Sequence, residues 1–105
     1  MAFKSLFIAH APDADCEKHK SAIDTGKLKL FTVVVKSQDE AIKVSKSMYE
    51  KERIDGIILC PGFTHVDVAE IFRALEGIMS VSVARGDGPS NQITQPVLQK
   101  EFFNK

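Results

Sequence analysis

A short stretch, residues 57–65, does most to limit how this chain can fold. The apolar run 57–60 ends abruptly at Pro61-Gly62, and Thr64 then opens a segment in which apolar residues recur at helical spacing. This pattern predicts a buried strand, a tight turn and a helix N-terminus. In an open parallel sheet such a junction lies at the carboxyl edge of the strands, where ligands usually bind. The sequence therefore indicates the place of a site without identifying its ligand.

The rest of the chain continues this alternation of strands and helices. Apolar and β-branched runs predict four strands, at residues 3–9, 28–35, 54–60 and 78–84. Capping residues predict the helices between them: Asp15 before a helix over 16–25 that Gly26 ends, Ser37 with Glu40, Thr64 with Asp67, and a last helix from Pro96 to about Phe103. A polar loop is the alternative for residues 16–25. The spacing of apolar residues does not define the structure of residues 92–105.

Alternating strands and helices require parallel strands joined by crossovers. We therefore predict one α/β domain over residues 1–105, in which helices cover both faces of a four-stranded parallel sheet in three layers. The expected strand order is 2-1-3-4, half of a flavodoxin-like sheet, and it opens a crevice between His10 and Cys60. One face receives less apolar cover than the other. We expect a second copy of the chain to complete that face or an edge strand, as a homodimer, with a monomer as the alternative.

Composition and charge exclude several classes of protein. The chain has 44% hydrophobic and 27% charged residues, and 14 Lys and Arg balance 14 Asp and Glu. These values are ordinary for a globular protein and lack the basic footprint of a nucleic-acid binder. No apolar run approaches the ~20 residues that span a membrane. Without a secretion signal, Cys16 and Cys60 are expected to be free thiols, and the expected location is cytoplasmic.

Polar residues follow all four predicted strands and should gather at one rim of the sheet. The expected ligand-binding residues are Asp13, Gly62, Phe63, Thr64, Arg85, Asp87, Ser90 and Asn91. The turn at 62–65 favours an anion, because helix-start N–H groups, the helix dipole and a Thr hydroxyl meet there; an ordinary capped helix is the alternative. Arg85 is expected to clamp a carboxylate or phosphate, unless it pairs locally with Asp87. The spacings of a Walker or Rossmann motif are absent.

Three residues are candidates for catalysis at the same rim. Cys60, close to a helix start, is a candidate nucleophile, with a small apolar residue that ends a strand as the alternative. His10 and His65 are candidates for a general base across the crevice, with hydrogen-bonded loop histidines as the alternative. No zinc-protease motif and no paired-cysteine spacing occurs, so no metal is predicted, and nothing in the sequence identifies a cofactor.

Three strings give the chain a family resemblance: FKSLFIAHAPDAD at 3–15, ILCPGFTH at 58–65 and VSVARGDGPSN at 81–91. With them, the chain resembles a family of small microbial proteins catalogued only as a domain of unknown function, over essentially its whole length. The resemblance implies no activity. The residues themselves predict a protein that binds a small anionic metabolite between the first and third strands. A small lyase or isomerase using His10, Cys60 and His65, or an oligomeric scaffold without ligand, are the alternatives.

Overall fold

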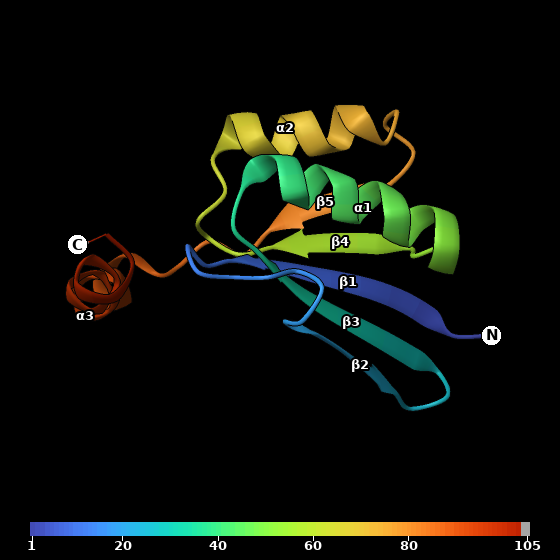
Figure 1. Cartoon of the computed structure of the whole chain (residues 1–105), viewed down its shortest axis with the longest axis horizontal. Coiled ribbons are helices and arrows are strands. Elements are labelled where there is room, and N and C mark those ends of the chain that lie inside the picture. The colour runs from blue at the N-terminus through green and yellow to red at the C-terminus, as the bar shows by residue number, and fades with distance from the viewer. Residues whose placement is uncertain (104–105) are drawn as a thin grey trace.

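The structure, a computed structural model, describes residues 1–103. Five strands form one sheet in the order β2-β3-β1-β4-β5 (Figure 1). Their bounds are Phe3–His10 for β1, Lys20–Asp24 for β2, Leu28–Val35 for β3, Gly56–Leu59 for β4 and Ser80–Val83 for β5. The parallel strands β3, β1, β4 and β5 are the four predicted ones in their predicted mutual order, but the sheet is mixed because β2 runs antiparallel to β3.

The expected helix over 16–25 is wrong, because β2 and β3 form a hairpin there. Gly26, with φ of +100°, lies in the hairpin turn instead of ending a helix, and its N–H donates to Asp24 Oδ1 at 2.8 Å. Thr25 closes the turn with a backbone bond to the carbonyl of Leu28 at 2.9 Å. All five residues of β2 are exposed, so no apolar period marks this strand in the sequence. Pairing with β3 therefore decides its conformation.

Two helices cover one face of the sheet, as Figure 1 shows: α1, Gln38–Glu52, and α2, His65–Ala74. Both begin where their caps predict. Ser37 Oγ accepts the N–H of Glu40 at 3.2 Å. At the start of α2, Thr64 Oγ1 accepts the N–H of Asp67 at 3.1 Å while the Asp67 carboxylate accepts that of Thr64 at 2.9 Å. This reciprocal capping box satisfies two N–H groups that the helix leaves free.

The prediction of helices on both faces is wrong, and the domain has two layers instead of three. The last helix, α3 (Gly88–Leu98), continues into a short π-helix, η1 (Gln99–Phe103), and lies beyond the carboxyl end of the sheet (Figure 1). It starts earlier than the predicted helix at 96–103, and Pro96 lies inside it. The second face lacks a helix because the segment expected to supply one forms β2 instead.

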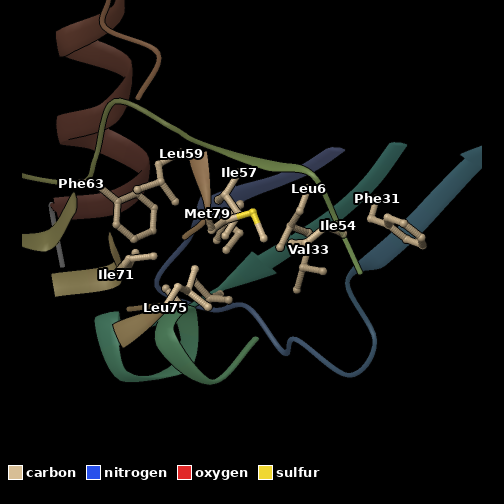
Figure 2. Packing of buried hydrophobic residues seen from close by; sticks show 13 residues of the cluster. Leu6, Phe31, Val33, Ile54, Ile57, Leu59, Phe63, Ile71, Leu75 and Met79 are labelled. Carbon is tan, nitrogen blue, oxygen red and sulfur yellow. The ribbon is translucent and has the colours of Figure 1, made fainter. Parts of the chain in front are cut away.

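The hydrophobic core lies between the sheet and the two helices α1 and α2. Leu6 and Ile57 from the sheet and Ile71 from α2 are at most 1% exposed, and Figure 2 shows them within one cluster. Their neighbours in the strands point to the opposite face, where Ile58 is 39% exposed. The core therefore fixes α1 and α2 on one side of the sheet. None of the helices within residues 1–103 has the length and apolar character needed to cross a membrane.

Candidate functional site

A cavity of about 480 Å³ lies at the carboxyl edge of the sheet, where β1 and β4 end. One wall is formed by residues at the end of β1 and in the loops after β4 and β5: Ala9, His10, Cys60, Pro61, Gly62 and Gly86. The C-terminal elements α3 and η1 form the other wall, with Asn91, Thr94, Leu98, Phe102 and Phe103. The structure thus brings together four of the residues singled out in the sequence: His10, Cys60, Gly62 and Asn91.

The register of the parallel strands brings the ends of β1 and β4 side by side. Ile8 pairs with Leu59, and the N–H of Cys60 donates to the carbonyl of Ile8 at 3.0 Å. The turn that follows brings Gly62 back against both strands: a β-carbon at this position would lie 3.6 Å from Cys60 Sγ and 3.9 Å from His10 Cβ. These are ordinary van der Waals distances, so Gly62 lies against both Cys60 and His10, and a side chain larger than a methyl group at this position would extend into the space beside them.

The His10 ring makes one hydrogen bond to the backbone, and this bond determines which ring nitrogen carries the proton. Its Nε2 lies 3.1 Å from the carbonyl oxygen of Lys36. Because a carbonyl can only accept, Nε2 carries the proton, and Nδ1 of the neutral ring is free to accept a hydrogen bond or a proton. Cys60 is a free thiol, and no hydrogen bond joins it to His10 within residues 1–103. The pair is adjacent to Gly62 but is not a preformed nucleophile–base dyad.

The cavity lining is mostly apolar and carries no Lys, Arg, Asp or Glu. Its polar side chains are those of His10, Cys60, Asn91 and Thr94. Such a lining favours a small ligand with an apolar body and one or two polar groups. No group of three or more His, Cys, Asp or Glu side chains within the described part of the chain is arranged to hold a metal ion.

The Phe63 side chain is 3% exposed and packs in the core, and it is not part of the cavity lining. At the expected anion site, residues 62–65, the backbone N–H of Thr64 is already bonded to a carboxylate of the protein. The Asp67 carboxylate bonds to the N–H of Thr64, and the Thr64 hydroxyl bonds to the N–H of Asp67. An anion approaching this helix start would therefore meet a carboxylate. His65, an exposed residue at the beginning of α2, is not part of the cavity lining.

The remaining predicted residues lie near the rim but outside the cavity lining. Arg85 donates from Nη1 to the carbonyl of Pro61 at 3.1 Å and makes no ion pair with Asp87 within residues 1–103. Asp87 is the N-cap residue of α3, and the carbonyl of Ser90 accepts from Thr94 Oγ1 at 3.4 Å. Asp13 is exposed in the turn after β1. The Arg85 bond links the loop after β5 to the turn after β4.

Sequence reasoning identified Asn91 in the C-terminal wall but missed its other members, Thr94, Leu98, Phe102 and Phe103. Thr94, Leu98 and Phe102 are spaced four residues apart, which places them along one side of a helix. That spacing was the available signal, but the turn-forming residues 88–91 concealed the start of α3. Pro89 at the first turn of this helix is a normal helix-starting residue.

Comparison with known protein families identifies a match, which covers nearly the whole chain. A family model described as "Family of unknown function (DUF6506)" matches residues 3–99. The chain belongs to the DUF6506 family. The match spans the five strands and nearly all of the cavity lining, and it confirms the resemblance to a domain of unknown function. No curated protein and no solved structure matches the chain. Membership of DUF6506 implies no activity.

Proposed function

We propose that the protein binds a small molecule in the cavity between the ends of β1 and β4. The observation that carries this proposal is the cavity itself, about 480 Å³ in volume, with an apolar lining and few polar groups. Ligand sites commonly measure roughly 300–1,000 Å³ and have this composition. The position also supports the proposal, because β1 and β4 flank the point where the connections from the sheet change direction, a common ligand site in open α/β sheets.

The lining defines the class of ligand more closely. His10 is the one side chain of the lining that can carry a positive charge, and only when it is protonated. This makes a single carboxylate a better match than a phosphate, which usually requires Lys or Arg. The protonated ring would donate from Nδ1, because Nε2 is engaged with the Lys36 carbonyl. The ligand we propose is a small carboxylic acid whose apolar body contacts Leu98 and Phe102.

A second candidate is an enzyme of the lyase or isomerase type that uses the same cavity. The observation that favours it is the fixed orientation of His10, since a backbone acceptor on one ring nitrogen leaves the other ready for proton transfer. In this role Nδ1 of the neutral His10 ring would take a proton from a carbon atom of the substrate and, in an isomerase, return it to a neighbouring carbon. Cys60 lines the same cavity. An enzyme should convert a bound acid to a product, and His10→Ala should abolish this turnover. A protein that only binds the acid should show no turnover in either form.

Cys60 provides a direct reporter of occupancy. Cys16→Ser leaves Cys60 as the one remaining thiol, since the chain contains two cysteines. A panel of small aliphatic and aromatic carboxylic acids is added, and the rate of maleimide addition to Cys60 is measured. An acid in the cavity should slow that rate. At 100 times its dissociation constant it should also add about 2.7 kcal/mol of stability. For a chain of this length that corresponds to a rise in Tm of roughly 12 °C.

Two glycine variants form a matched control. Gly62→Leu fills the space beside Cys60 and His10 at a position without positive φ, so it should abolish the protective effect of the acids. Gly88→Ala adds a methyl group where no atom lies within 4 Å and should bind as the wild type does. If no acid of the panel protects Cys60 or raises Tm, the proposal fails, and the scaffold without ligand becomes the better description. The same protection in Gly62→Leu would place the ligand elsewhere.

A further inference from the structure

The face of the sheet turned away from α1 and α2 has no helix over it, and we call it the open face. It consists of the odd-numbered residues of β1 and β2 and the even-numbered residues of β3, β4 and β5. The register fixes this assignment, because Phe7 pairs with both Thr32 and Ile58, and Ile58 pairs with Ser82. Successive side chains of a strand alternate between faces. The open face therefore lies directly behind the core residues Leu6 and Ile57.

Large apolar side chains of the open face remain in solvent. Phe3 is 57%, Ile23 59% and Ile58 39% exposed, while Leu6 and Leu59 on the helix side are fully buried. These exposed residues belong to β1, β2 and β4, so the apolar surface extends across most of the sheet. Neutral hydroxyl residues of the same face lie among them, namely Ser5, Ser21, Thr32, Ser80 and Ser82. Several large apolar side chains exposed on one face usually mark an interaction site.

The open face carries no charge. None of its strand positions is Asp, Glu, Lys, Arg or His, although 27% of the chain is charged. The charged residues of the strands, such as Lys4, Lys20 and Lys29, alternate onto the helix side. A two-fold dimer brings the same patch of both subunits together, so a charged patch would repel its own copy. An open face without charged residues is compatible with self-association. It has no charged group that could attract a partner of opposite charge.

The size of the open face fits a small dimer interface. At ~3.3 Å per residue and ~4.8 Å per strand, the five strands cover roughly 460 Å² in plane. Side-chain relief increases this area. Stable complexes begin at about 600 Å² buried per partner. The sheet edges are poorer interfaces: β5 has four residues, and β2 begins with Lys20 and ends with Asp24, charges that discourage edge pairing.

We propose that a second copy of the chain covers the open face, with the two sheets packed face to face about a two-fold axis. The missing third layer of the domain is then the sheet of the partner, at the usual ~10 Å separation of packed sheets. Ala9 belongs to the open face and also lines the cavity, so the partner lies beside the ligand site. Dimer formation nevertheless does not require a ligand in the cavity, and the two are measured independently.

Sedimentation equilibrium of the full chain tests the dimer. The wild type should have twice the 11.6 kDa mass of the chain. Ile58→Lys should halve the measured mass, because it places an ammonium group in the apolar interface. Ile58 is 39% exposed in the single chain, so the variant should keep the wild-type circular dichroism spectrum. Ile78→Lys is the control: Ile78 is 66% exposed and lies outside the sheet, so the variant should remain dimeric.

Ile23→Lys gives a second, independent disruption, since Ile23 is 59% exposed on the edge strand β2 and contributes little to the core. It should also yield a folded monomer. A wild type that is monomeric at the highest concentration it tolerates would overturn the proposal. Folded Ile58→Lys or Ile23→Lys proteins that retain the dimer mass would also overturn it, because the dimer would then use another surface.

Discussion

Replacing Phe63 with alanine should destabilise the protein strongly. The Phe63 ring is 3% exposed and packs in the cluster that contains Leu59 and Ile71 (Figure 2). Phe→Ala changes in cores cost about 3–5 kcal/mol. The entropy of unfolding, ~2.1 cal/mol/K per residue, amounts to about 0.22 kcal/mol/K for a chain of this length. A loss of ~4 kcal/mol should therefore lower Tm by roughly 18 °C.

Calorimetry of Phe63→Ala and Phe72→Ala measures this difference with a matched control. Phe72 is 45% exposed, so the same truncation there should cost about 1–2 kcal/mol, or roughly 5–9 °C in Tm. Both comparisons are made with the wild type under identical conditions. If Phe63→Ala melts no lower than Phe72→Ala but no longer binds the acids, Phe63 is a ligand contact, and the reasoning from burial is refuted.

Three further changes test individual parts of the structure. Thr64→Ala should lower the free energy of unfolding by about 1 kcal/mol in urea titrations, and by much less in an Asp67→Ala background; fully additive losses would contradict the capping box. Gly26→Ala, at φ of +100°, should cost about 1 kcal/mol or more, while Gly88→Ala stays within ~0.5 kcal/mol; equal melting temperatures would contradict the hairpin. Leu98→Glu should abolish the thermal shift by the acids because it places a carboxylate in the cavity; an unchanged shift would exclude α3 from the site.

Much of the fold could be predicted because its signals are local. The caps at Ser37 and Thr64 and the apolar runs of β1, β3 and β4 reflect hydrogen bonding and burial within a few residues. The strand β2 could not be predicted in this way. Its five exposed residues show no apolar period, and its extended conformation depends on pairing with β3. The absence of this helix, together with the position of α3 beyond the carboxyl end of the sheet, leaves one face of the sheet open.

The candidate site was only partly predictable for a related reason. His10 and Cys60 follow directly from the rule that parallel strands end at one edge, and the structure places both in the cavity. Phe63 follows a tight turn, where strand alternation no longer fixes the direction of a side chain. Its ring is buried in the core instead of facing the cavity. Leu98 and Phe102 were missed because the second wall depends on where α3 packs, which no local pattern specifies.

Binding of a small acid in the cavity beside Gly62 is tested most directly by a crystal structure of the chain with the carboxylic acid that best protects Cys60. The ligand should lie between Gly62 and Leu98, with its carboxylate within hydrogen-bond distance of His10 Nδ1. An acid bound away from these residues, for example against the outer surface of α1 and α2, would contradict the account.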